Sequence, residues 1–302
     1  MGGIMTRFIV PEEINEITLK DFLRKNCGIS LTGWRKIKQS NTLKVNDICV
    51  SPGRAIVAAQ DIITYELPSP SESPIIPNDI FLDILYEDEY LLVIDKPAHM
   101  LVHPTASERE NTLANGVLFY YRQNNLTLNY HPVHRLDKNT SGLVLIAKYP
   151  HIQHQLSRAL EKKSLMRDYI AFVHNKMKNP MGTIHLPIAR HPNSIIERIV
   201  AENGQVAITH YEVVESYDDA CQVHLSLETG RTHQIRVHLS HLGHPIIGDD
   251  LYGSPSSLIN RQALHAYKLS FLHPVSKKQI TVHSSLPNDM NNLLTKLKNP
   301  MN

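Results

Sequence analysis

The chain has 302 residues, of which 42% are apolar and 20% are charged, as in ordinary soluble globular proteins. Its longest apolar run, Tyr90–Ile94, is too short to span a bilayer, and residues 1–10 lack the apolar core of a signal peptide. The three cysteines are widely spaced, which indicates a reducing cytoplasm without disulfides or a thiolate zinc site. A net charge of +2 neither requires nor excludes a nucleic-acid partner.

The first part of the chain, residues 8–66, predicts a small unit of helices and strands. Thr18 is a favourable N-cap for a helix that carries leucine and phenylalanine on one face. A second helix is expected over residues 31–39. The alternation within residues 42–50 predicts a hairpin that turns at Asn46-Asp47.

Basic residues are concentrated in this small unit. Between residues 20 and 44 there are seven basic side chains and one acidic one, Asp21. Such a stretch attracts phosphates, although a merely solvated helical face has the same pattern. The layout resembles the small RNA-binding module first found in a ribosomal small-subunit protein, and this resemblance makes candidate RNA contacts of Arg24, Lys25, Arg35, Lys36 and Lys38.

A linker is predicted over residues 67–79, because residues 67–74 are rich in proline and serine and have little to bury. The remainder, residues 80–302, predicts an α+β domain with a mixed, largely antiparallel sheet, since its strands follow one another without regular helical crossovers. The expected strands are 91–94, 143–147, 169–173, 207–214 and 221–227, and the expected helices are 112–122, 151–162 and 232–242. Gly243 is suited to cap the last helix.

The run HRLDKNTSG, residues 134–142, leads directly into the apolar strand at 143–147. It places the short carboxylate of Asp137 at a strand edge with Arg135 and Lys138 close by. A carboxylate among cations stays ionised and can act as a nucleophile or an electrostatic stabiliser. The alternative from the residues alone is a local ion pair of Asp137 with Arg135 or Lys138.

A second informative run, LETGRTHQIRVH, occupies residues 227–238 and reads as a strand, a glycine turn and a helix. Five helical positions separate Arg231 from Arg236, which puts the two side chains on different faces. We therefore expect them to have different tasks. One can bind phosphate near the helix start, and the other can pair with a partly buried carboxylate.

These runs carry a family resemblance. HRLDKNTSGLVLIAK (134–148) resembles the signature of RluA-type pseudouridine synthases, and LETGRTHQIRVHLSHLGHPIIGDDLYG (227–253) is similar to the family's other long motif. YEDEYLLVIDKPAHMLVHP (86–104) and RQALHAYKLSFLHP (261–274) resemble two further motifs of the family, in family order. The resemblance implies a pseudouridine synthase catalytic domain.

The resemblance also implies roles for individual residues. Asp137 matches the catalytic aspartate, and Tyr169 matches the tyrosine that packs on the target base. Arg236 matches the partner of the catalytic aspartate, with Arg231 as a second candidate, and Arg135 matches the arginine that fills the space of the flipped-out base. The chain departs from the family pattern at His99 and His174, where glycine is common, and at Arg167, where lysine is frequent.

The implied reaction detaches uracil from ribose, turns it and rejoins it through carbon 5. It needs no cofactor and no metal, although the spacing of His238, His241 and His244 suggests a zinc alternative. Structured RNA is the implied partner, with large-subunit ribosomal RNA before transfer RNA, and the enzyme is expected to be a cytoplasmic monomer. The competing hypotheses are a carboxylate-dependent nucleoside or glycoside hydrolase and a non-catalytic RNA-binding protein.

Overall fold

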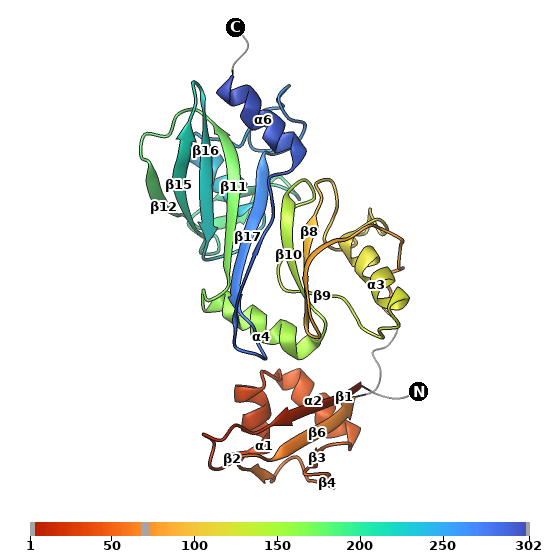
Figure 1. Ribbon diagram of the computed structural model, residues 1–302. Coiled ribbons are helices and arrows are strands. Elements are labelled where there is room, and N and C mark those ends of the chain that lie inside the picture. The colour runs from red at the N-terminus through yellow and green to blue at the C-terminus, as the bar shows by residue number, and fades with distance from the viewer. Residues whose placement is uncertain (1–3, 68–72, 300–302) are drawn as a thin grey trace.

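The computed structural model describes residues 4–67 and 73–299, and Figure 1 shows them as two parts joined by the segment that contains the predicted linker. Residues 68–72 of that linker lie outside the described residues. In the described part of the chain, no helix is both long and apolar enough to cross a membrane.

The first part is a small mixed unit, drawn in red and orange in Figure 1. Its elements are β1 (Ile4–Ile9), β2 (Ile17–Thr18), α1 (Leu19–Asp21), the π-helical turn η1 (Phe22–Asn26), α2 (Leu31–Ser40), β3 (Lys44–Val45), β4 (Ile48–Cys49), β5 (Ile56–Val57) and β6 (Ile62–Leu67). Strand β1 pairs with β6 along its whole length, from Ile4 to Ile9.

Local signals in the sequence account for most of this unit. The Thr18 hydroxyl accepts a hydrogen bond from the backbone N–H of Asp21, which caps α1 as predicted. The predicted hairpin joins β3 to β4, and Asn46 and Asp47 both adopt positive φ (50° and 65°), as a tight two-residue turn requires. Side chains such as Phe22, Trp34 and Ile63 form a core that belongs to this unit.

The second part is built on a ten-stranded sheet with the order β12-β15-β16-β11-β17-β10-β8-β7, to which β18 and β9 are added beside β17 and β10. Its strands are β7 (Asp83–Glu87), β8 (Leu91–Lys96), β9 (His131–Pro132), β10 (Ser141–Ala147), β11 (Met166–His174), β12 (Met181–His185), β15 (Ile208–Ser216), β16 (Ala220–Leu227), β17 (Leu264–Leu272) and β18 (Gln279–His283). A separate hairpin pairs β13 (Ile188–Arg190) with β14 (Arg198–Val200). Among the described strands only β10 and β17 pair in parallel, so the predicted mixed, largely antiparallel sheet is confirmed.

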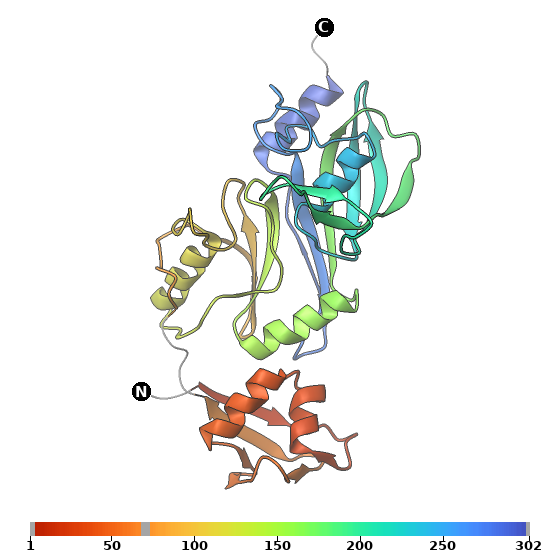
Figure 2. The same ribbon diagram turned by 180° about the vertical axis from the view of Figure 1, so that it is seen from behind.

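Among the described residues, four helices accompany the sheet. They are α3 (Leu113–Gln123), α4 (Pro150–Glu161), α5 (Gln234–His241) and α6 (Asn288–Lys298). Figure 1 shows α3 beside β8 and β9, with α4 at one end of the sheet and α6 at the other. Figure 2 shows the sheet from behind. The predicted helices at 112–122 and 151–162 match α3 and α4 to within a residue at each end. Helix α5 starts two residues later than expected because His233 has φ 58°, a left-handed conformation that a helix cannot contain. Gly243 follows α5 with φ 82°, as its capping role predicts.

The two parts meet at α4. Both views show the small unit facing this helix, and the side-chain amide of Gln155 donates a hydrogen bond to the carbonyl of Cys27 at 2.8 Å. Phe8 contacts the ring of His151 edge to face. Helix α4 also leads to the large pocket described below, because Leu160 and Glu161 at its carboxyl end line that pocket.

Candidate active site

A pocket of about 1050 Å³ opens beside the ends of β10, β11 and β16. Its lining includes the five residues that the family resemblance singled out: Arg135, Asp137, Tyr169, Arg231 and Arg236. They come from segments that are far apart in the chain. The basic residues of the small unit do not line this pocket; Lys25, Arg35, Lys36 and Lys38 are exposed, and Arg24 is half-buried.

Asp137 stands at the start of a tight turn that leads into β10. The backbone N–H of Thr140 donates to its carbonyl, and its side chain is 25% exposed toward the pocket. Its Oδ2 atom accepts a hydrogen bond from Nη1 of Arg236 at 3.2 Å. The alternative of a local ion pair is therefore wrong, because Lys138 pairs with Glu108 instead and Arg135 forms no ion pair with Asp137.

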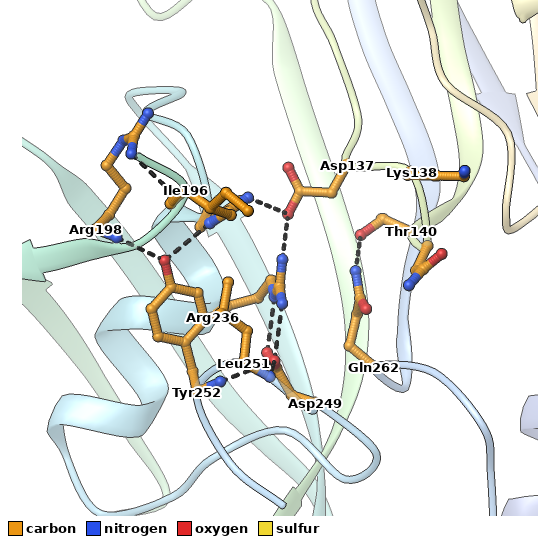
Figure 3. A network of polar contacts seen from close by, with 12 residues as sticks. Asp137, Lys138, Thr140, Ile196, Arg198, Arg236, Asp249, Leu251, Tyr252 and Gln262 are labelled. Atoms are coloured by element: carbon orange, nitrogen blue, oxygen red, sulfur yellow. Dashed lines mark hydrogen bonds and ion pairs between the residues drawn. The ribbon is translucent and has the colours of Figure 1, made fainter. Parts of the chain in front are cut away.

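Arg236 joins two carboxylates inside the protein (Figure 3). Besides Asp137, it holds the fully buried Asp249 with two parallel hydrogen bonds of 2.7 and 2.8 Å. Its guanidinium also lies over the ring of Tyr252, 5.1 Å from the centroid. Burial by itself lowers the pKa of Arg236, but the hydrogen bonds and charges of Asp249 and Asp137 raise it above its ordinary value, so the group stays charged.

The two arginines of the second motif have different environments, as their spacing predicted. Arg236 is buried, whereas Arg231 is exposed and donates from Nε to the carbonyl of Val206 at 3.0 Å. Arg135 is exposed at the wall of the same pocket. Arg231 and Arg135 therefore present cationic groups to whatever fills the pocket, and Arg236 is committed to carboxylates.

Tyr169 forms part of the pocket wall from β11 and is almost completely buried. Burial raises the pKa of its phenol, which keeps the side chain neutral. Two residues earlier on the same face of the strand, Arg167 is also buried and lines the pocket. Its Nη2 atom donates to the carbonyl of Thr229, while its buried Nε has no hydrogen-bond partner among the described residues.

The loop before α3 is tied to the turn that carries Asp137. The buried ammonium group of Lys96 donates to the carbonyls of Pro97, Met100 and Lys138. Nδ1 of His99 lies 3.0 Å from Oδ1 of Asn139. His99 adopts φ 63°, a left-handed conformation that glycine adopts without steric cost.

His233 and Tyr252 complete the surroundings of Asp137. Figure 3 shows Tyr252 beside Arg236. Nε2 of His233 lies 4.0 Å from Oδ2 of Asp137, and its Nδ1 lies 2.8 Å from the Tyr252 hydroxyl. His233 and Tyr252 were not predicted as site residues, and neither were Asp249 and Arg167. The sequence signal available for His233, Asp249 and Tyr252 was only their presence inside the 227–253 motif.

Two of the three histidines considered for zinc, His238 and His244, have other partners. Both ring nitrogens of His238 are within hydrogen-bonding distance of protein oxygens, those of Thr209 and Leu186, and Nδ1 of His244 faces the carbonyl of His174. Across residues 4–67 and 73–299, no group of three or more His, Cys, Asp or Glu side chains is arranged to hold a metal ion.

Comparison with known proteins gives the same family as the motifs. The model of the RNA pseudouridylate synthase family matches residues 90–241, about half of the chain. The uncharacterized RNA pseudouridine synthase YjbO of Bacillus subtilis is 43% identical over 78% of this chain and 83% of its own. Ribosomal large subunit pseudouridine synthase D of Vibrio cholerae is 37% identical over 82% of this chain and 81% of its own.

A solved structure also shares the fold. Human RNA pseudouridylate synthase domain containing 4 superposes with a TM-score of 0.59 at 24% identity, covering 71% of this chain and 92% of its own. The family model and the curated relatives do not support the hydrolase and the purely RNA-binding hypotheses. The chain belongs to the RNA pseudouridylate synthase family, as the four motifs predicted, and it is an RNA pseudouridine synthase, an isomerase.

Proposed function

We propose that this enzyme converts uridine to pseudouridine in large-subunit ribosomal RNA, with Asp137 as the catalytic residue. Transfer RNA is the alternative substrate. The names of relatives such as the Vibrio cholerae and Neisseria meningitidis large-subunit synthases favour ribosomal RNA. We also expect the enzyme to work as a monomer in the cytoplasm, where it meets its RNA.

One observation carries the assignment of Asp137: its carboxylate faces the large pocket while Arg236 holds one of its two oxygens. Attack on ribose carbon 1′, attack on the base and proton abstraction all require a carboxylate oxygen that reaches the substrate. Asp249, the other acid in contact with Arg236, is fully buried, so it has no access to a substrate.

The pocket also suits a detached base. Apolar side chains of Val102, Leu136, Ile235 and Leu264 line it together with Tyr169. Such a wall excludes water, which would otherwise compete with rejoining of the base and the sugar. A uridine within a helix cannot reach this pocket, so the target must be flipped out of its stack.

We assign the binding of RNA beyond the target base to two groups of basic residues. Arg135 and Arg231 at the pocket wall are placed to bind the phosphates or bases next to the target. The small unit, residues 8–66, is proposed to add a second contact through the helical residues Arg24, Lys25, Arg35, Lys36 and Lys38. Recognition by shape and phosphate contacts is usual for structured RNA.

The test is to map pseudouridine in ribosomal and transfer RNA from a deletion strain complemented with wild type or Asp137→Asn. We expect one or a few sites in large-subunit ribosomal RNA to disappear on deletion and to return only with wild type. Asp137→Ala, which also removes the shape of the side chain, serves as a second variant. If Asp137→Asn restores the sites as well as wild type, Asp137 is not the catalytic residue; if the lost sites lie in transfer RNA, the substrate assignment is wrong.

A further inference from the structure

Asp137 presents its two carboxylate oxygens to different surroundings. Oδ2 faces Nη1 of Arg236 at 3.2 Å and Nε2 of His233 at 4.0 Å. In the part of the chain that the structure describes, Oδ1 has no hydrogen bond or ion pair, and Figure 3 shows it pointing away from Arg236. The carboxylate is therefore held through one oxygen, and the other is free.

The hydrogen bonds behind His233 favour one of its two neutral tautomers. The backbone N–H of Arg198 donates to the Tyr252 hydroxyl at 2.8 Å. Among the described residues, His233 Nδ1, at 2.8 Å, is then the atom left to accept the hydroxyl proton. A neutral imidazole that accepts at Nδ1 has its N–H at Nε2, the atom that faces Asp137.

The site favours this neutral form of His233. Burial lowers the pKa of the ring, and the charges of Arg236 and Arg198 lower it further, although Asp137 and Asp249 act in the opposite direction. The distance of 4.0 Å from Nε2 to Oδ2 exceeds that of a hydrogen bond. Contacts of this kind are often long in an empty active site and shorten when substrate is bound.

We propose that His233 is a positioning residue for Asp137: its Nε2–H group, together with Arg236, holds Oδ2 and leaves Oδ1 as the oxygen that acts on the target uridine. Tyr252 serves this arrangement indirectly by keeping the Nε2–H tautomer. The inference rests on the proposed catalytic role of Asp137 and adds which oxygen reacts and what orients it.

Two substitutions separate the role of Nε2 from the effect on folding. Glutamine places its amide N–H near the position of Nε2, so His233→Gln keeps a donor for Asp137. Asparagine reaches only the position of Nδ1, so His233→Asn loses that donor. For stability the order of the two variants is the opposite, because His233 has φ 58° and asparagine tolerates this conformation better than glutamine.

The experiment measures pseudouridine formation by the purified full chain on total RNA from the deletion strain, with urea denaturation of each variant. We expect His233→Asn to be at least as stable as His233→Gln but to lose at least tenfold in kcat, with KM within about twofold. His233→Gln should retain kcat within about threefold. Tyr252→Phe should lose less than His233→Asn, and the double variant His233→Asn/Tyr252→Phe should be no slower than His233→Asn alone.

Asp137→Asn is measured beside them to keep two failures apart. If Asp137→Asn is inactive and His233→Gln and His233→Asn have the same kcat, the positioning role of His233 is overturned. The same holds if the activities follow the stability order, asparagine above glutamine. If Asp137→Asn is active, the proposed catalytic residue is wrong and the inference falls with it.

Discussion

Arg236 and Asp249 form a bidentate ion pair inside the protein, with 2.7 Å between Nε and Oδ2 and 2.8 Å between Nη2 and Oδ1. Asp249 in turn accepts the backbone N–H groups of Leu251 and Tyr252 on the same Oδ1 atom. This acid therefore fixes both the guanidinium that holds Asp137 and the segment that carries Tyr252. A residue without access to substrate determines the geometry of the proposed catalytic carboxylate.

Asp249→Asn tests this relationship. The change leaves Arg236 as a buried charge without its main partner, so we expect the free energy of unfolding to fall by about 3 kcal/mol. We also expect kcat to fall at least tenfold, because Arg236 no longer holds Asp137 in one place. Urea denaturation and pseudouridine formation measure the two effects.

Glu87→Gln is the matched control, because it breaks the ion pair of the buried Lys148 at a place remote from the pocket. It should lower stability and leave kcat unchanged. A loss of stability without a loss of kcat in Asp249→Asn would mean that Arg236 does not orient Asp137.

Arg167 supplies a second prediction. Arg167 lines the pocket and forms no ion pair among the described residues, so a phosphate of bound RNA would supply a counterion for its guanidinium. We expect Arg167→Met to raise KM about tenfold and to reduce the slope of log affinity against log salt by about one. Binding of total RNA at several salt concentrations measures this slope.

Lys268→Met is the control, because it also removes one positive charge. Lys268 pairs with Asp168, which follows Arg167 on β11 and points to the opposite face of the sheet. Lys268→Met should leave the salt slope as in wild type. Equal slopes for Arg167→Met and Lys268→Met would show that Arg167 does not contact phosphate.

Gly142 gives a prediction about folding. It has φ 112°, and a Cβ atom there would lie 2.2 Å from the carbonyl oxygen of Ala266 on β17. Gly142→Ala must therefore separate β10 from β17 just after the turn that carries Asp137. We expect a loss of about 2–4 kcal/mol in the free energy of unfolding.

Gly53→Ala is the control, since a Cβ atom at Gly53 meets nothing within 4 Å and the residue does not have positive φ. That variant should unfold at the same urea concentration as wild type or a slightly higher one. Comparable stability of the two alanine variants would contradict the close approach of β10 and β17.

Buried histidines predict a loss of stability in mild acid. Burial lowers the pKa to about 4 for His131, His151 and His265 and to about 3 for His134. In the unfolded chain these rings titrate near pH 6.5. Below that value the unfolded state binds more protons, so their stabilising effect is complete above pH 6.5 and is lost as the pH falls toward 4.

Each ring that is protonated in the unfolded chain but neutral in the folded protein should contribute about 1.4 kcal/mol per pH unit to this loss. His134→Gln preserves an acceptor for the backbone N–H of Leu145 without a titrating group. Urea denaturation between pH 7 and 4.5 should therefore give a shallower decline for this variant than for wild type. Parallel curves would mean that the pKa of His134 is the same in the folded and the unfolded protein.

Patterns in the sequence were enough to predict the family, the α+β class and most elements whose signals are local. Thr18, the Asn46-Asp47 turn and Gly243 act through their own backbone neighbours, so short patterns sufficed to predict them. Strand β17, which lies between β10 and β11, was not predicted as a strand. Its run of buried and half-buried residues lacks a clear alternation, and its place follows from pairing with strands far away in the chain.

The partners of the site residues could not be predicted from the sequence, because they come together only in the folded protein. The sequence placed Arg135 and Lys138 next to Asp137, yet the cation that holds Asp137 is Arg236, 99 residues further along the chain. No sequence pattern predicted that Asp249 is buried against Arg236, that Nε of Arg167 is unpaired, or that His233 contacts Tyr252. An ion pair or a buried donor depends on distances of a few ångströms and on what shares its burial, and these are fixed by the packing of whole strands and helices.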